Sequence, residues 1–455
     1  MRRHVHAQHA MLMTEGPIAR QLIAFALPLL LGNLFQQLYN AADSLIVGNI
    51  LGSDALAAVS SSSSLIQLFI GFFNGLAMGA GVVISRHYGA RNIPRVQKTI
   101  HTMLAGGLVV GLFMTVIGAA LSPVLLRLMG TPEVVLPQSI AYFRTYFFGS
   151  LAFVMYNICM GILQAVGDSR HPLYYLIISS MINVALDLLF VGVLGFGVAS
   201  AAVATAISQV VSMLLCLRRL MHSDPDYRVD IRKLGFDGAA LRQILSNGIP
   251  SGIANCIISF ANVVVQSNIN AFGAAAMAGC GAHSRIEGFA FLPVTCFNMA
   301  LTTFVSQNLG AGRTDRVKKG IRIGIFCSAG IAETVALIIW CFSPQLIGLF
   351  DSNPEVIAYG VMHQRTTTPF FFLAAYTHAI AASLRGAGKS SVAMLGMAIC
   401  WCVIRVPYVT LATQIRPVLT TVSWAYPITW GLSCIFFTIY YFKADWMGQK
   451  RTRTL

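Results

Sequence analysis

Twelve apolar stretches follow one another along this chain, with only short polar segments between them. An α-helix of about 20 residues is long enough to cross the hydrocarbon core of a bilayer. Backbone polar groups must be paired in lipid, so stretches of this kind cross it as helices. The predicted spans are 19–46, 55–86, 99–121, 140–165, 172–194, 197–217, 243–271, 276–308, 321–343, 358–384, 391–412 and 419–442.

The composition supports a polytopic membrane protein built only from helices. Of the 455 residues, 56% are hydrophobic and 10% are charged, whereas soluble domains have about 25% charged residues. Twelve spans with short loops use up the length, so no large soluble domain is expected. The lipid bilayer is therefore the main partner of the chain.

The distribution of Lys and Arg predicts the orientation. Most of the 31 basic residues lie at one set of span ends, whereas the opposite loops hold Arg127, Arg416 and little else. The positive-inside rule then places both termini in the cytoplasm, which needs an even number of spans. The net charge of +15 is explained by the basic residues at these span ends. We therefore expect no nucleic acid partner.

The sequence lacks the common motifs of ATPases, metalloproteases and serine hydrolases. We find no P-loop, HExxH or GxSxG, so we expect neither an enzyme nor an ATP-driven pump, and no cofactor. The ten cysteines include no CxxC pair and are interpreted as small buried hydrophobic residues. We expect a monomer.

The chain repeats itself at a constant offset. SRHYGARNIPRVQKTI (85–100) and SQNLGAGRTDRVKKGI (306–321) align without a gap and agree at seven of sixteen positions. We predict two six-helix bundles, 1–218 and 242–455, joined by a cytoplasmic linker at 219–241. Six spans return the chain to the same side, so the bundles are parallel and related by a pseudo-two-fold axis. This is an alternating-access architecture with the substrate path between the halves.

Asp43 is the first residue that points to chemistry. It lies in PLLLGNLFQQLYNAADSLIVGNILG (28–52), and an ionised carboxylate on a spanning helix costs about 2.5–3.5 kcal/mol on insertion scales. We interpret Asp43 as lining a wet pocket where it exchanges a cation. The alternative is an acid at a helix end that lipid headgroups and water solvate.

Asp187 lies at a matching depth. Counting 1.5 Å per residue, Asp43 and Asp187 both lie about 12–14 Å below the outer ends of their spans, and Thr205 is at a similar level. Asn183 is one turn from Asp187 on the same face. Two close carboxylates repel, so one is expected to take up a proton, which describes a proton-exchange site. Alternatively, Asp187 and Asn183 only satisfy each other between helices.

The second half has different acids. At the offset of the repeat, Val264 corresponds to Asp43 and Tyr408 corresponds to Asp187, so the ion-handling side is predicted in the first half. Glu287 could contact an ion or the substrate, or it could pair with His378 or Arg405 as structural support. Glu333 is interpreted as a packed, protonated acid.

Together these features resemble the MATE family, the multidrug and toxic compound extrusion transporters. The resemblance covers nearly the whole chain. Its anchors are the six-plus-six repeat and four groups of motif residues. These groups are Pro28, Gln36, Asp43-Ser44 and Val47-Gly48; Gly89-Ala90 with Gly310-Ala311-Gly312; Gln164 to Asp168; and Asn183 to Asp187.

The resemblance implies a MATE/MOP-like fold and export of organic cations and amphiphilic drugs in exchange for H⁺ or Na⁺. By similarity to the DinF-type branch, the first-half ion network comprises Asp43, Asp187, Asn183, Thr205 and Tyr142, with Na⁺ possible at the two acids. Gln36 and Asn157 would contact the drug.

The NorM-type branch places acids in spans seven and ten, and here span seven has none while span ten offers only His378. Glu287 and His378 are therefore the second-half candidates for substrate contact. The expected location is the bacterial plasma membrane. The alternative function is a flippase for lipid-linked saccharides, for which Arg285 and Arg405 are the available cations.

Overall fold

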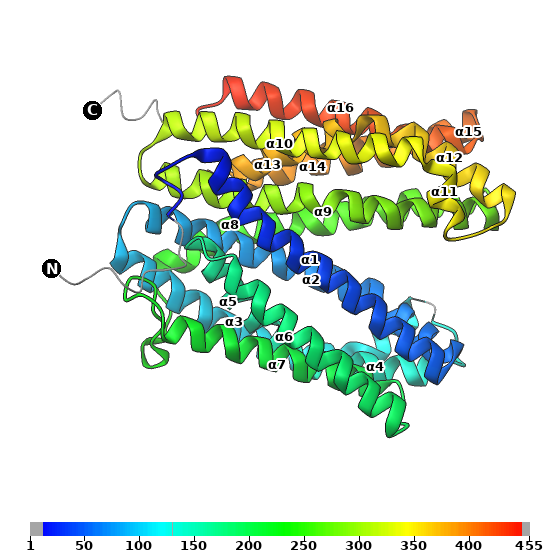
Figure 1. Cartoon of the computed structure of the whole chain (residues 1–455), viewed down its shortest axis with the longest axis horizontal. Coiled ribbons are helices and arrows are strands. Elements are labelled where there is room, and N and C mark those ends of the chain that lie inside the picture. Colours follow the sequence, from blue (N-terminus) through cyan, green and yellow to red (C-terminus); the bar gives the residue numbers. More distant parts are fainter. Residues whose placement is uncertain (1–11, 130, 448–455) are drawn as a thin grey trace. The chain divides into compact units, whose positions relative to one another are not determined.

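The computed structural model describes residues 12–129 and 131–447, without the side chains at 44, 53–54, 56–58 and 60–65. The terminal basic residues used for the orientation therefore lie outside the described part. Within it, all regular structure is helical. The ribbons α1–α7 run from blue to green in Figure 1, and α8–α16 run from green to red.

Two units divide the chain. One contains residues 27–245 and the other contains 13–26 and 246–455. The helices of the first half are α1 (Ile18–Leu51), α2 (Ser53–Gly89), α3 (Ile93–Leu128), α4 (Leu136–Phe148), α5 (Ser150–Ala165), α6 (Arg170–Asp187), the π-helix η1 (Leu188–Val193) and α7 (Ala199–Met221).

The linker contains η2 (Ile231–Lys233). The second half contains α8 (Gly238–Asn270), α9 (Ala274–Gly310), α10 (Thr314–Cys341), α11 (Ser343–Gly348), α12 (Pro354–Thr367), η3 (Thr368–Phe370), α13 (Phe371–Gly386), α14 (Ser390–Met397), the π-helix η4 (Ala398–Ile404), α15 (Arg405–Ile415) and α16 (Leu419–Lys443).

The repeat is present in the packing. In the first unit α3 and α2 pack on α5, and α7 packs on α4, α5 and α6; in the second unit α10 and α9 pack on α13, and α16 packs on α12, α13 and α15. Three positions with positive φ also recur at the offset of the sequence repeat, namely Gly52 with Gly273, Arg91 with Gly312, and Gly167 with Gly388.

Within residues 12–129 and 131–447, ten helices are long and apolar enough to cross a membrane, or eleven if the bent pair α4 and α5 forms one span. This pair bends by 47° at Gly149. The predicted span 358–384 is interrupted by η3 at the corresponding place. Its sequence QRTTTP (364–369) is polar and ends in a proline, which removes a helical hydrogen bond and breaks the helix.

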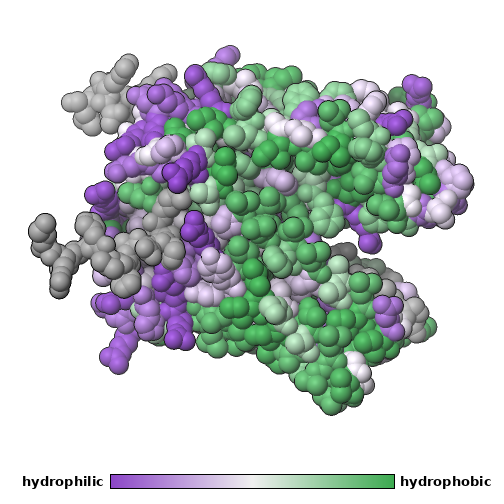
Figure 2. Space-filling model, viewed as in Figure 1, coloured by the Kyte–Doolittle hydropathy of each residue, from purple (hydrophilic) through white to green (hydrophobic). Residues whose placement is uncertain are grey.

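Hydropathy varies along the helices. Figure 2 shows hydrophobic residues over the middle of the visible helices, and hydrophilic residues mainly towards the helix ends. Of the ten cysteines, all free, five are buried, namely Cys159, Cys216, Cys280, Cys296 and Cys400. Exposed apolar side chains such as Val116 and Phe326 then face lipid.

The linker is held tightly against the first unit. Tyr227 and Val229 are each 3% exposed and belong to its hydrophobic core. Lys98 forms an ion pair with Asp237 at 3.2 Å. The backbone N–H of Ala240 and the Lys98 ammonium both hold the pKa of Asp237 below its usual value.

A close backbone contact between helices of the second unit involves Gly279 on α9 and Gly360 on α12. A Cβ at Gly279 would lie 2.5 Å from the carbonyl oxygen of Val356 and 2.7 Å from the Gly360 nitrogen, whereas a Cβ at Gly281 would meet nothing within 4 Å. Both obstacles at Gly279 are backbone atoms, so the helices must separate to accept a methyl group.

We therefore predict that Gly279→Ala lowers the free energy of unfolding by about 2 kcal/mol, the usual cost of overpacking. Gly281→Ala is the matched control and should gain up to about 1 kcal/mol from helix propensity. Thermal unfolding of the two variants in detergent measures the difference. Equal melting temperatures would show that the contact is not close.

Candidate functional site

Asp43 and Asp187 meet inside the first unit. Asp43 lies on α1 and Asp187 is the last residue of α6. Asp187 has no exposed surface. Their carboxyl groups contact each other closely enough to form a hydrogen bond when one of them carries a proton. The acids that the sequence placed at one depth are thus also on facing sides of their helices.

Asn183 and Thr205 complete one side of this site. When the Asn183 amide is turned to satisfy both neighbours, its nitrogen donates to Asp187 Oδ2 at 3.2 Å and its oxygen accepts from the Thr205 backbone N–H at 3.2 Å. The Thr205 hydroxyl donates to the Ala201 carbonyl at 3.1 Å. This links α6 to α7 at the level of the acids.

One oxygen of each acid still lacks a hydrogen-bond partner among the described residues. The Oδ1 atoms of Asp43 and Asp187 are both buried, and neither has a hydrogen-bond donor among the described residues. Two carboxylates in contact cannot both stay ionised without a cation between or beside them. A proton on one carboxyl, or a small cation bound by these oxygens, removes the repulsion. Carboxylate oxygens are hard donors that suit Na⁺ as well as H⁺.

Three tyrosines surround the acids. Tyr142, on α4, lies within electrostatic range of both carboxyl groups and is 6% exposed. Tyr39 is also within electrostatic range of both carboxyl groups, whereas Tyr146 lies beside Tyr39 and Tyr142. Sequence reasoning missed these two, although Tyr39 is one turn before Asp43 and Tyr146 one turn after Tyr142. Spacing of four residues on a helix was the signal that could have found them.

The two predicted drug contacts lie apart from these interactions. Gln36 is on the same side of α1 as Asp43, two turns earlier, and its side chain is exposed. Asn157 on α5 is 6% exposed and its amide donates to the Phe153 carbonyl at 2.8 Å. None of the acid-pair interactions described above includes either residue.

The helix carrying Asp187 changes its winding directly after it. The π-helix η1 begins at Leu188 and ends at Val193. Wide turns of this kind are rare in proteins. Those that do occur are often found at functional sites. The second unit has the same feature, since η4 ends just before Arg405.

Arg405 is the centre of the polar interior of the second unit. It is 1% exposed and is among the largest fully buried side chains. Its Nε and Nη2 atoms donate to the Thr429 hydroxyl at 3.0 and 2.7 Å. The guanidinium stacks at 4.7 Å from the ring centroids of both Trp401 and Tyr426.

Glu287 and His378 both lie near the Arg405 cluster. Glu287 is within electrostatic range of Arg405, but the two do not form an ion pair. His378 instead packs edge-on against Trp401, with ring centroids 5.5 Å apart. Of the two partners considered for Glu287, Arg405 is therefore the one that interacts with it.

A histidine pair borders the same interior. The rings of His283 and His363 meet edge to face at 4.8 Å. His363 Nδ1 is 2.7 Å from the Ser423 hydroxyl, whereas His283 Nδ1 is buried without a partner among the described residues. The polar interior around Arg405 thus combines a buried cation with Glu287 and a histidine pair, in contrast to the acid pair of the first unit.

Comparison with known proteins gives the same division into halves. The MatE family model matches the chain twice, at residues 28–189 and 250–411. The first match contains the acid pair, and the second contains Glu287 and Arg405.

Two relatives and one solved structure match nearly the whole length. The probable multidrug resistance proteins YoeA and YpnP of Bacillus subtilis (strain 168) are 32% and 30% identical, and the matches cover 82% and 88% of this chain and 82% and 89% of theirs. The crystal structure of MATE in the bent conformation superposes with a TM-score of 0.90 at 23% identity, over 99% of this chain and all of the other. Through the family model and these relatives, the chain belongs to the MATE family of multidrug efflux transporters.

Proposed function

We propose that this transporter exports cationic or amphiphilic small molecules from a bacterial cell in exchange for H⁺ or Na⁺. The halves 1–218 and 242–455, joined by the linker 219–241, would alternate access to the two sides of the plasma membrane. Both termini lie in the cytoplasm in this proposal. The coupling ion binds at Asp43 and Asp187, with Asn183, Thr205 and Tyr142 around them.

One observation carries this proposal, namely two carboxyl groups in contact whose Oδ1 atoms are buried and without donors among the described residues. Within the described part of the chain, no Lys or Arg is among the groups that act on the two carboxyls. A site of this kind needs a proton or a cation, and it loses that ion when water or a competing cation reaches it.

Coupling follows if the ion and the drug prefer different states of the protein. A ligand shifts a conformational equilibrium only by its difference in affinity for the two states. Ion uptake from outside would favour the state that releases drug, and drug binding inside would favour the state that releases the ion. One pH unit supplies about 1.4 kcal/mol, enough for roughly a tenfold drug gradient per proton.

The substrate contacts proposed here are Gln36 and Asn157 in the first half and Glu287 and His378 in the second. The negative or neutral character of these groups suits a cationic or amphiphilic molecule. A flippase for an anionic lipid-linked saccharide is not favoured, because the named relatives are multidrug resistance proteins and Arg405 is already enclosed by two rings and Thr429.

Inverted membrane vesicles containing the protein test the proposal. We expect uptake of ethidium or DAPI when a pH gradient or a Na⁺ gradient is imposed alone, and the effective gradient identifies the ion. Vesicles without the protein are the control. If neither gradient moves either dye, cation export is contradicted, and a flippase for an anionic lipid becomes the better hypothesis.

A further inference from the structure

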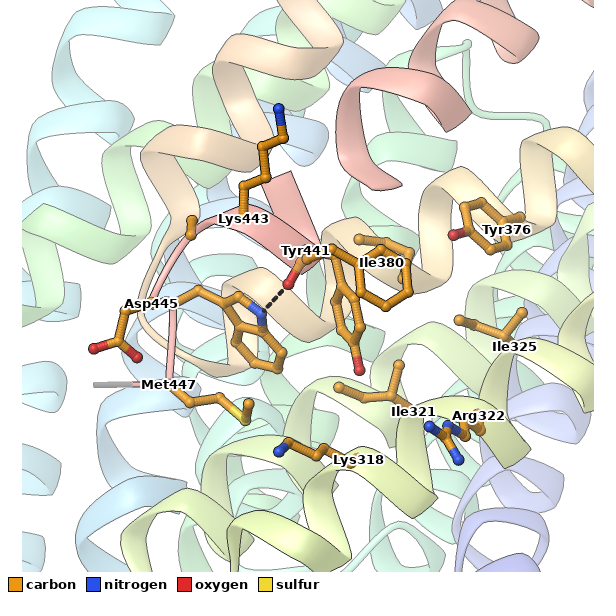
Figure 3. Close-up of a pocket in the computed structure, with 13 residues that line it drawn as sticks. Lys318, Ile321, Arg322, Ile325, Tyr376, Ile380, Tyr441, Lys443, Asp445 and Met447 are labelled. Carbon is orange, nitrogen blue, oxygen red and sulfur yellow. Dashed lines mark hydrogen bonds between the residues drawn. The ribbon is translucent and has the colours of Figure 1, made fainter. Parts of the chain in front are cut away.

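A hollow lies in the second unit, away from the polar interior around Arg405. It has a volume of about 790 Å³ and lies where α10, α13 and α16 meet the residues after α16. Figure 3 shows Lys318 and Arg322 next to each other along α10, and Lys443 extending away from them at another edge. The indole N–H of Trp446 donates to the Tyr441 carbonyl at 3.0 Å and fixes the segment that borders the hollow.

The first unit shows what fills the corresponding place there. At the offset of the sequence repeat, Gln97 corresponds to Lys318 and His101 corresponds to Arg322. Gln97 donates to the carbonyl of Pro225 at 3.0 Å, and His101 contacts the carbonyl of Asp230 at 3.1 Å. In the first unit, these two positions therefore hold the linker.

The linker also covers an apolar wall. Tyr227 and Val229 are buried in a hydrophobic cluster with Ile100, Leu104 and Cys159. The residues that correspond to these three in the repeat line the hollow of the second unit, and they are Ile321, Ile325 and Ile380. Ile321 and Ile380 are each 1% exposed, so neighbouring residues of the second unit cover most of this wall, and the hollow is the space that remains open beside it.

The charges around the two places also differ. In the first unit Lys98 and Lys233 are paired with Asp237 and Asp230. In the second unit the lining has Lys318, Arg322 and Lys443 against one acid, Asp445, and no ion pair joins these three cations to an acid within the described residues 12–129 and 131–447. The hollow therefore combines an apolar wall with an excess of positive charge at its rim.

A groove continues from this hollow along α10. It has a volume of about 490 Å³ and is lined by Arg322, Ile325, Phe326, Ala329 and Gly330. Arg322 and Ile325 belong to both spaces. The spacing of three and four residues follows one face of the helix, and Phe326 on this face is 81% exposed. An acyl chain would fit such a lipid-facing groove.

We propose that this hollow binds an anionic phospholipid, with its phosphate between Lys318 and Arg322 and one acyl chain along α10. Basic pockets between helices at the cytoplasmic side of a membrane are suited to anionic headgroups. The chain's own residues 448–455 are a poor occupant, since Lys450, Arg451 and Arg453 repel the rim. The site is independent of the acid pair and of the transport cycle proposed above.

Lipid retention by the purified full-length protein tests this site. Native mass spectrometry would compare phosphatidylglycerol with phosphatidylcholine of the same acyl chains. We expect preferential binding of phosphatidylglycerol and a loss of about 25-fold in affinity in Lys318→Gln/Arg322→Gln, about fivefold for each cation. Lys318→Arg/Arg322→Lys keeps the charges and should keep the lipid.

The matched control is Lys319→Gln/Lys389→Gln, which removes two cations of the same unit that do not line the hollow. Equal retention of phosphatidylglycerol by the two double glutamine variants would overturn the proposal. Displacement of phosphatidylglycerol by inorganic phosphate at equal concentration would overturn it in favour of a small-anion site. A gain of tenfold or more on deletion of residues 448–455 would identify the tail as the occupant and overturn it as well.

Discussion

Replacing Asp43 by asparagine is expected to reduce gradient-driven dye export to the level of vesicles that lack the protein. Asparagine keeps the size and the hydrogen-bonding capacity of the side chain, but it cannot bind or release a charge. Asp187 would then face a neutral amide instead of a carboxyl group. The repulsion that makes the pair take up an ion at working pH would be gone.

Asp187→Asn should have the same effect, and the double variant should be no worse than either single one. Groups that act as one unit are strongly non-additive. Dye accumulation in inverted vesicles measures each variant at matched protein abundance.

Glu333→Gln is the control for this series. Glu333 is another acid in a predicted span, and its carboxyl accepts a hydrogen bond from the Phe372 backbone N–H at 3.3 Å. We expect this variant to export like the wild type. If Asp43→Asn also exports like the wild type, Asp43 is a solvated helix acid and the proposed ion site is wrong.

Arg405→Lys is expected to lower the free energy of unfolding by about 3 kcal/mol, although it preserves the charge. The guanidinium offers two nitrogens to Thr429 and a flat surface to the rings of Trp401 and Tyr426. An ammonium is smaller and strongly hydrated, so it cannot make these contacts together. Charged hydrogen bonds contribute about 1.5–3 kcal/mol, and a desolvated cation–π contact about 2 kcal/mol.

Arg405→Met should lower the free energy of unfolding less than Arg405→Lys does, because methionine carries no charge that must be paired in the interior. Replacing a buried ionic group by an apolar one is often tolerated, whereas leaving a buried charge poorly paired is not. Thermal unfolding followed by tryptophan fluorescence compares the variants, since Trp401 touches the site. A lysine variant as stable as the wild type would show that only the charge matters there.

Much of the architecture could be predicted from the sequence, because span length and charge distribution depend on local composition. The depth of Asp43 and Asp187 could be counted along their helices, since the rise per residue is constant. The rotation of each helix about its own axis could not be obtained from the sequence in this way. It depends on packing against neighbouring helices, and it decides that Tyr39 faces the acids and that Tyr146 faces Tyr39 and Tyr142.

Other features depended on tertiary contacts. The break at Thr368–Phe370 could have been predicted from Pro369, but the π-helices before Arg405 and after Asp187 leave no clear sequence signal. The double stacking of Arg405 requires residues from α16 and η4. The linker was predicted only as a polar connection, whereas Tyr227 and Val229 make it part of the core.

The buried cysteines of the first half provide a chemical reporter of its local opening. The two described thiols of the first unit, Cys159 and Cys216, are both buried, whereas Cys341 in the second is exposed. Brief alkylation of the native protein should therefore label the second half alone. The delay before the first half is labelled measures how often that half opens locally, and ions that bind the acid pair should lengthen it.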